Sequence, residues 1–425
     1  MKQFFIIGTL LVLLIAGCTT PIQVPGNNDE PEPVITEKPV LDDSQATIEG
    51  VNQIVQGNSQ FGFNLYSKLP QDSSNVFFSP YSISTAIAMA YEGAQEQTAQ
   101  EIQTVFGFPV DNSVLRSANA SIYNKYNKKD LNYILSTANA LWVQQDYTLL
   151  DNYKNVAQNS YGGKASNVDF VNQTEQTRQT INSWVENETY GKIKNLFGPG
   201  SLTPDYRLVI TNAIYFKGKW KEKFNEESTE NQDFTLANGS KVQVPMMRQF
   251  NEDFRYAETN EWKALEMDYE GNDLSMLILL PKENNLTELE QNLTLESVKN
   301  LKEQMSYETT NVFFPRFKFN TKYSLNDSLG QLGMPTAFSN AANFSGITGS
   351  QDLKIGIVIH QAFVEVNEKG TEAAAATGIG FELTSAPFEP EEPKEFKADH
   401  PFIFVIQDTE TGNILFMGKV NNPLN

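Results

Sequence analysis

The sequence predicts an α+β protein in which helices dominate the first half and strands the second. Two observations support this expectation. Apolar residues recur at helical spacing up to about residue 107, and they alternate with a period of two in many later segments. Hydrophobic residues make up 40% of the 425 residues and aromatic residues 11%, which is enough for a large core. Helices followed by strands are typical of folds with mostly antiparallel sheets.

Local signals mark the first helices. One helix is expected over residues 48–65, where apolar residues lie at helical spacing. Ser79 and Pro80 predict the start of a second helix, because serine caps helices and proline fits the first helical position. Gly93 predicts its end, because glycine readily adopts the conformation that terminates a helix.

Three later helices are expected. Thr98 and Glu101 have the spacing of a capping box, which predicts a short helix that stops at Gly107. Apolar spacing predicts two further helices, at Ile181–Tyr190 and Leu325–Leu332.

Strand patterns dominate the second half of the chain. Between residues 355 and 359, isoleucines alternate with other residues, as a half-buried strand requires. Strands are expected at Thr137–Val143, Leu208–Phe216, Leu274–Leu280, Val312–Phe319, Ile355–Val366, Pro401–Ile406 and Ile414–Val420.

The N-terminus has the features of an export signal. Lys2 is followed by an apolar run of 12 residues, Phe4–Ile15, which is too short to span a membrane. Small residues then precede Cys18, the only cysteine, in a pattern that resembles a lipoprotein signal. We therefore expect a signal peptide at residues 1–17 and acylation of Cys18. An ordinary signal peptide with an incidental cysteine is the alternative.

Residues 18–45 are expected to form an extended spacer, because prolines and acidic residues leave little that can pack. Residues 46–425 contain no second linker and no repeat, so they are expected to form one domain. The spacer would hold this body, extracellular or periplasmic, at the outer face of a prokaryotic membrane.

The net charge of −20 argues against nucleic acid, whose phosphates are neutralised by Lys and Arg, and against a heparin-like activator. Acidity also has a simpler role in keeping a secreted protein soluble. A single cysteine excludes an intramolecular disulfide.

One segment does not fit its neighbourhood, because the strand pattern stops after Val366 and small residues follow. Its residues are Glu368, Lys369, Gly370, Thr371, Glu372, Ala373, Ala374, Ala375, Ala376 and Thr377. Alanines favour a helix, whereas the flanking glycines oppose it.

As a strand, this segment has one small and uncharged face, made of Thr371, Ala373, Ala375 and Thr377. Glu372 points the other way, and the absence of proline permits a central position in a sheet. Gly370 would supply a hinge. The segment could therefore enter between two existing strands, and a flexible surface loop is the alternative.

Several motifs together resemble the serpin family. They lie in family order from about residue 50 to the C-terminus: Asn75–Ile83, Gly93–Ala94, Asn212–Trp220, Glu368–Ala374, Phe396–Phe402 and Phe416–Val420. The resemblance implies a fold of eight or nine helices and three mostly antiparallel sheets with an exposed reactive-centre loop. It also implies a mechanism, in which a serine protease attacks the loop, forms an acyl-enzyme and is trapped when the cut loop inserts into the large sheet.

The resemblance assigns roles to residues outside the hinge. A polar shutter cluster beneath the central strands would consist of Ser79, Ser82, Asn212 and His360. The breach, where insertion starts, would contain Trp220, Arg316 and Glu368. We predict a salt bridge between Glu368 and Arg316.

Counting 17 residues from Glu368 places the attacked bond between Thr384 and Ser385, with Leu383–Thr384 as the alternative. The acidic, proline-rich segment from residue 385 to 396 is about four residues longer than expected. A Thr or Leu suits elastase-, chymotrypsin- or subtilisin-like proteases. No Arg or Lys lies between residues 371 and 393, which argues against a trypsin-like target.

Other functions remain open. The protein could be a non-inhibitory serpin that acts as a binding module, or a cross-class inhibitor of cysteine proteases. An enzyme is disfavoured, because His360 and His400 are the only histidines and no Gly-x-Ser-x-Gly motif occurs. No cofactor or metal is expected. The predicted partners are a target protease and, through Cys18, a membrane, and we expect a monomer.

Overall fold

The computed structural model describes residues 38–69, 74–128, 131–371 and 392–425. Ten α-helices form among these residues: α1 (Ile48–Tyr66), α2 (Pro80–Tyr91), α3 (Glu96–Phe106), α4 (Asn112–Tyr126), α5 (Asp151–Tyr161), α6 (Thr174–Glu188), α7 (Leu286–Asn292), α8 (Leu295–Glu303), α9 (Asn326–Leu332) and α10 (Ser345–Thr348). There are also two 3-10 helices, η1 (Glu226–Ser228) and η2 (Pro335–Phe338). Eight or nine helices were expected; helices as short as α10, with four residues, are too short for apolar spacing to reveal.

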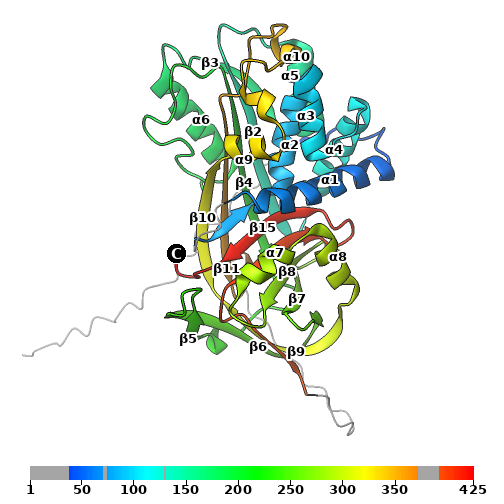
Figure 1. The fold of residues 1–425 in the computed structure, drawn as a ribbon, viewed down its shortest axis with the longest axis vertical. Helices are drawn as coiled ribbons and strands as arrows, with labels where there is room; N and C mark the ends of the chain where they lie inside the picture. Colours follow the sequence, from blue (N-terminus) through cyan, green and yellow to red (C-terminus); the bar gives the residue numbers. More distant parts are fainter. Residues whose placement is uncertain (1–37, 70–73, 129–130, 372–391) are drawn as a thin grey trace, which may run out of the picture. The chain divides into compact units, whose positions relative to one another are not determined.

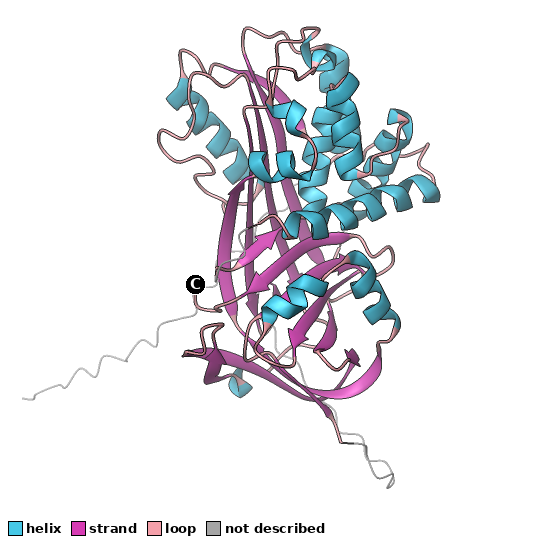
Figure 2. Cartoon of the chain, viewed as in Figure 1, coloured by secondary structure: helices cyan, strands magenta, loops and turns pink. Residues whose placement is uncertain are grey.

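Fifteen strands form among the same residues. They are β1 (Val76–Phe78), β2 (Tyr133–Gln144), β3 (Lys164–Val168), β4 (Leu208–Lys219), β5 (Glu230–Thr235), β6 (Lys241–Glu258), β7 (Trp262–Asp268), β8 (Leu274–Pro281), β9 (Ser306–Pro315), β10 (Phe317–Ser324), β11 (Ile357–Asn367), β12 (Gly370–Thr371), β13 (Lys394–Lys397), β14 (Phe402–Asp408) and β15 (Ile414–Val420). The predicted α+β class is confirmed (Figure 2).

The strands form two sheets rather than the three that were expected. One has six strands in the order β10-β11-β12-β4-β2-β3; the other has nine, in the order β1-β15-β14-β8-β7-β6-β9-β13, with β5 paired to β6. The nine-stranded sheet is continuous because β6 is 18 residues long. Its first part pairs with β5 and its last four residues with β7. Most pairs are antiparallel, as predicted, and three are parallel: β2–β3, β4–β11 and β9–β13.

Helix α2 lies where the sequence places it. The Ser79 hydroxyl accepts a hydrogen bond from the Ser82 N–H, and Pro80 occupies the first helical position. All twelve residues of α2 are buried, because the helix packs between the six-stranded sheet and β15. It therefore brings its first-turn serines underneath the centre of that sheet.

The capping box predicted at Thr98 is wrong. Helix α3 begins two residues earlier, at Glu96, and Thr98 lies inside it. The Thr98 hydroxyl accepts a hydrogen bond from the Asn343 N–H, and the Glu101 carboxylate accepts two from Thr336. Both side chains therefore serve tertiary contacts. The end of the helix at Gly107, in the left-handed conformation, is as predicted.

The single strand predicted over Val312–Phe319 is also wrong. The chain turns at Arg316, whose N–H donates to the Pro245 carbonyl, 2.9 Å away. On either side lie β9, in the nine-stranded sheet, and β10, in the six-stranded sheet. The apolar pattern continues through the turn because residues on both sides of it, Phe314, Phe317 and Phe319, are buried, and for this reason the pattern did not reveal the break.

The main core covers one face of the six-stranded sheet, and α6 covers part of the other face (Figure 1). On one face, β4 residues such as Ile210 and Ile214 pack into the main core with α2. On the other, Val209 and Ala213 of β4 pack against Ile181 of α6. A strand added between β4 and β11 would therefore be buried on the core side and, where α6 lies over it, on the other side as well.

Part of the segment that the sequence assigned to the spacer contacts the body. Lys38 contacts α6, and Leu41 contacts α4. Leu41 is 5% exposed and packs on Ala120 and Tyr123. A lone leucine among prolines gave no periodic signal for this contact.

Candidate functional site

Strands β4 and β11 are the central pair of the six-stranded sheet, and they are parted only at one end. From Ile357 to Phe363, β11 pairs directly with β4 in a parallel ladder of seven residue pairs. Beyond this ladder, β12 lies between them. Thr371 pairs antiparallel with Gly218 of β4 and with Val366 of β11. The hinge segment has therefore begun a strand inside the sheet.

Gly370 makes this close approach possible. Its φ angle is +148°, in a region that residues with a Cβ rarely adopt. A Cβ there would lie 2.0 Å from the Gly218 carbonyl oxygen and 2.7 Å from the Lys219 Cα. Both neighbours are backbone atoms that cannot rotate away, so the position requires glycine.

Two stacked aromatic rings line the opening. The Trp220 N–H donates to the Lys369 carbonyl at 2.9 Å, and its indole N–H donates to the Asn367 carbonyl at 3.0 Å. The ring stacks on Tyr269 with centroids 4.6 Å apart. The Tyr269 hydroxyl lies 2.7 Å from the Thr371 hydroxyl. Tyr269 was not predicted from sequence, since it is 49 positions from Trp220 and no local pattern marks it.

The predicted ion pair between Glu368 and Arg316 is present. The Arg316 Nε lies 2.6 and 2.7 Å from the two Glu368 carboxylate oxygens, and its Nη2 also contacts this group. The Glu368 side chain is 3% exposed, so the carboxylate of this ion pair is buried. The Thr229 hydroxyl, not predicted from sequence, donates to the same carboxylate. Lys369 adds an ion pair with Glu226 at 3.0 Å.

The four predicted shutter residues lie together. The Ser79 N–H donates to His360 Nε2 at 3.2 Å, and the His360 Nδ1 contacts the Asn212 side-chain oxygen. The Asn212 amide N–H₂ donates to the Ser82 hydroxyl. Asn139 of β2, which sequence reasoning missed, completes the cluster. Its side-chain oxygen accepts hydrogen bonds from both Asn212 and Ser82.

The hydrogen-bond network determines which ring nitrogen of His360 carries the proton. Because the Ser79 N–H must donate, Nε2 accepts and Nδ1 carries the hydrogen that is donated to Asn212. Burial lowers the pKa of His360 to about 3, so the ring is neutral at physiological pH. The cluster therefore closes β4 against β11 without any charge.

Several predicted site residues lie outside the described residues. They are the hinge positions Glu372, Ala373, Ala374, Ala375, Ala376 and Thr377, the reactive-bond candidates Leu383, Thr384 and Ser385, and the lipidation candidate Cys18.

The second histidine forms no catalytic constellation. His400 lies with Nδ1 2.9 Å from the Asp399 carboxylate and Nε2 2.6 Å from the Pro281 carbonyl oxygen, so neither nitrogen faces a hydroxyl. Within the described ranges, no group of three or more potential metal ligands is found.

The central strands of the six-stranded sheet are thus parted at one end by the chain's own hinge and paired directly with each other beyond it. Residues 56–423 match the family described as serpin (serine protease inhibitor), and the chain therefore belongs to the serpin family. Serpins are protease inhibitors rather than catalysts, although some members do not inhibit.

The chain is 42% identical to an uncharacterized serpin-like protein of Methanosarcina mazei, over 99% of its own length and 98% of that relative. It is 39% identical to human leukocyte elastase inhibitor, over 88% of this chain and 100% of that protein. The solved structure of human thyroxine-binding globulin is also similar, with a TM-score of 0.80 and 30% identity. That match covers 88% of this chain and 100% of the other.

Proposed function

We propose that the protein is a suicide-type inhibitor of elastase-, chymotrypsin- or subtilisin-like serine proteases. The protease would form an acyl-enzyme with the segment after Thr371, and that segment would then enter the sheet between β4 and β11. One observation carries the proposal: β12 is already paired on both sides, while β4 and β11 remain hydrogen-bonded below it. The similarity to leukocyte elastase inhibitor supports the choice of protease class.

The register of β12 predicts where each inserted residue would lie. Thr371 is opposite Gly218 and Val366, so each step along the hinge moves one step back along both neighbours. Six steps on, Thr377 would lie between Asn212 and His360, which now pair directly with each other. Insertion would therefore break the hydrogen bond that closes the shutter, and the threonine hydroxyl could replace it as both donor and acceptor.

The same register explains the small side chains. Residues 373, 375 and 377 would face the buried side of β4 that contains Phe216 and Ile214, where little space is available. Glu372 would lie on the other face, beside Lys217. The seven parallel pairs of β4 and β11 would be replaced by two antiparallel ladders. Each added hydrogen bond contributes about 1 kcal/mol net.

Denaturing gels after mixing with proteases of the three classes test the proposal. We expect a covalent complex together with a cleaved form, and mass spectrometry of the released peptide would distinguish the Thr384–Ser385 bond from Leu383–Thr384. Ala373→Pro should convert the protein into a substrate, because proline cannot donate in a central strand. Clean cleavage without complex for every protease, in the unaltered protein, would refute inhibition.

A groove favours a second candidate function, the non-inhibitory binding module. It has a volume of about 890 Å³ and lies between α1 and α8. Val55 and Val298 give it an apolar wall, and Arg255 and two lysines lie in the same lining as Glu296 and Glu303. A small amphipathic ligand that carries both a cationic and an anionic group would fit this chemistry. Titration with thyroxine, chosen because of the similarity to thyroxine-binding globulin, would test it, and saturable binding by an uncleaved, non-inhibitory protein would favour this role.

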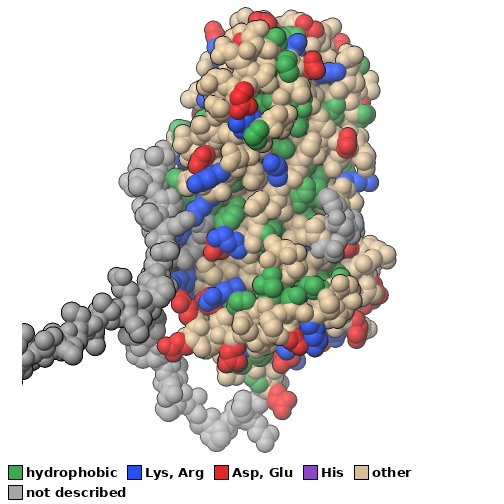
Figure 3. Space-filling view, turned by 90° about the vertical axis from the view of Figure 1, so that its left-hand side faces the viewer, with side chains coloured by type: hydrophobic (Ala, Val, Ile, Leu, Met, Phe, Trp, Pro, Cys, Tyr) green, Lys and Arg blue, Asp and Glu red, His purple; other side chains and the backbone are tan. Residues whose placement is uncertain are grey.

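We further propose that acylated Cys18 and the residues after it tether the protein to the outer face of a prokaryotic membrane. Among the described helices, none is both long and apolar enough to cross a bilayer. Figure 3 shows that Lys and Arg side chains as well as Asp and Glu side chains lie on one face of the body. Cys18→Ala should release the protein from the membrane fraction; continued sedimentation would contradict the tether.

A further inference from the structure

Residues 38–43, which we call the strap, are bound to α4 in a specific way. The side-chain amide of Asn124 accepts from the Leu41 N–H and donates to the Leu41 carbonyl, both at 2.8 Å. This arrangement imitates one rung of a β-ladder. Leu41 itself is buried against Ala120 and Tyr123. Two backbone hydrogen bonds and a buried side chain make the strap a docked segment.

The strap also reaches α6. The Lys38 ammonium lies 2.8 Å from the carboxylate of Glu188, the last residue of that helix. The two side chains are 22% and 33% exposed. The Glu188 carbonyl in turn accepts a hydrogen bond from the Ser136 hydroxyl of β2 at 2.7 Å. The end of α6 is therefore held both by the sheet and by the strap.

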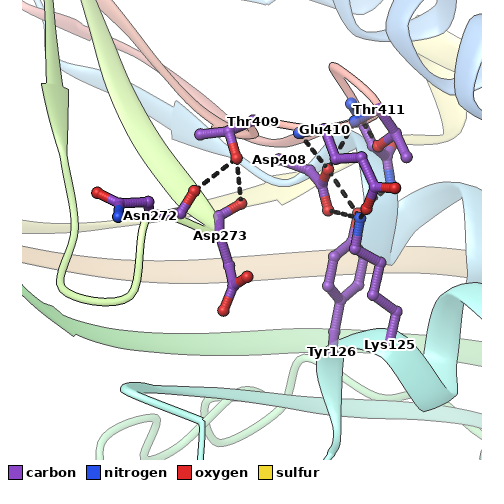
Figure 4. Close-up of polar contacts among 9 residues, drawn as sticks. Lys125, Tyr126, Asn272, Asp273, Asp408, Thr409, Glu410 and Thr411 are labelled. Atoms are coloured by element: carbon purple, nitrogen blue, oxygen red, sulfur yellow. Dashed lines mark hydrogen bonds and ion pairs between the residues drawn. The ribbon is translucent and has the colours of Figure 1, made fainter.

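The next residue after Asn124 anchors α4 to the nine-stranded sheet. Lys125 contacts both Asp408 oxygens, at 2.7 and 3.0 Å, and the Glu410 carboxylate at 2.8 Å, in the turn between β14 and β15 (Figure 4). The Asp408 side chain is fully buried, so it depends on this cation. These contacts form a continuous series, which we call the tie, from α6 through the strap and α4 to the β14–β15 turn.

Strand insertion would strain this tie. Ile181 of α6 belongs to one apolar cluster with Ala138 of β2, Val209 of β4 and Ile359 of β11. A further strand between β4 and β11 would move them apart by about 4.8 Å, the spacing of neighbouring strands. Helix α6 could then no longer keep its contacts with all three strands, and its end would have to move.

We propose that the strap restrains α6 and thereby slows insertion of the loop. The restraint on α6 stands on the contacts above, while its effect on insertion rests on the proposed function. In the tethered protein, the strap is also where the spacer joins the body, so a pull on the spacer would act first on α4 and α6.

Three variants of the full chain test the restraint. Leu41→Asp places a charge in the buried site, and Val40→Asp places the same charge one residue earlier, where the side chain is 87% exposed. Lys38→Met removes only the link to α6. Hydrogen exchange at the backbone amides in the last turn of α6 should rise by up to about fivefold in Leu41→Asp, because undocking the strap removes the Lys38–Glu188 ion pair through which it reaches α6. It should rise by up to about fivefold in Lys38→Met, as for a partly exposed ion pair, and stay unchanged in Val40→Asp.

The rate of insertion is measured separately, by tryptophan fluorescence after proteolytic cleavage of the loop. Trp184 of α6 lies edge-on against Trp142 of β2, with centroids 5.4 Å apart, and Trp220 lies at the opening, so the signal reports on α6 and on the opening together. The rate should rise in the same variants as the exchange. If the α6 amides exchange equally fast in Leu41→Asp and Val40→Asp, the strap does not restrain α6. If they exchange faster in Leu41→Asp but the rate of loop insertion is unchanged, the restraint does not slow insertion. If the unaltered protein shows no insertion at all, the proposed function fails, and the exchange result alone decides on the strap.

Discussion

The contact between β4 and β11 is built differently at its two ends. At one end β12 separates the strands, and charges hold the hinge through Glu368 with Arg316 and Lys369 with Glu226. At the other end the strands pair directly, and neutral side chains close the gap around His360. A buried charge cannot lose its partner without a large cost, whereas neutral donors and acceptors can exchange partners with an incoming strand. In the proposed mechanism, the charged end would therefore fix where a new strand starts, and the neutral end would oppose its progress.

The largest effect is expected from removing the cation at the charged end. Arg316→Met leaves the nearly buried Glu368 carboxylate without its ion pair, which should reduce the free energy of unfolding by about 3 kcal/mol or more. Urea unfolding of the uncleaved protein measures the change. Lys318→Met is the matched control, since its ion pair with Glu365 is largely exposed and should contribute less than about 1 kcal/mol. Equal losses in the two variants would contradict a special role for the Arg316 pair.

At the neutral end, the contribution of His360 to the free energy of unfolding should depend on pH. Because burial lowers the pKa of His360 to about 3, the folded ring stays neutral while the unfolded ring gains a proton below its ordinary pKa. The contribution of His360 is complete above about pH 6.5 and is lost as pH falls toward the folded value. Between pH 6.5 and 4.5 the loss should be about 2.3 kcal/mol, because the slope reaches 1.36 kcal/mol per pH unit only once the unfolded ring is mostly protonated.

Urea unfolding across this pH range tests the linkage. His360→Gln removes the titrating ring, while His400 and all carboxylates remain the same in both proteins. The difference between the two pH profiles therefore isolates His360. Parallel profiles would show that His360 titrates alike in the folded and unfolded states.

A smaller effect is expected from Asn139, which bridges Ser82 and Asn212. Asn139→Ala leaves two buried donors with fewer acceptors and should cost about 2 kcal/mol. Loop insertion after cleavage should also become faster, because the variant loosens the end that opposes the strand. Asn167→Ala, in the neighbouring strand but far less buried, serves as the control. A slower insertion rate in Asn139→Ala would contradict the comparison between the two ends.

The sequence could predict what is local and could not predict what depends on distant partners. Ser79 and Pro80 marked the start of α2 because a cap involves neighbours only. Thr98 had the same local pattern, but its hydroxyl is used by Asn343, 245 residues away. The docking of Leu41 depends on Asn124, 83 residues away, so composition alone assigned it to a spacer.

The candidate site also contains residues that the sequence could predict and residues whose roles depend on distant partners. Family motifs contain Glu368, Ser79, Ser82 and Asn212. The resemblance also assigned Arg316 and His360, although both lie outside the quoted motifs. Asn139 and Tyr269 carry no motif, and each became visible only when strands met across the sheet. The two-residue strand β12 could not be predicted either, since its pairing depends on how far β4 and β11 have parted.

The smallest expected effect lies at the charged end, where the hinge first enters the sheet. Tyr269→Phe removes the hydroxyl that contacts Thr371 and should cost about 1 kcal/mol. Thr371→Val removes the other hydroxyl at nearly constant volume, so the double variant should cost little more than either single one. Urea unfolding of the four proteins forms a double-mutant cycle. Fully additive losses would mean that the two hydroxyls do not hold the hinge, and that stacking of Trp220 on Tyr269 is sufficient to keep β12 in place.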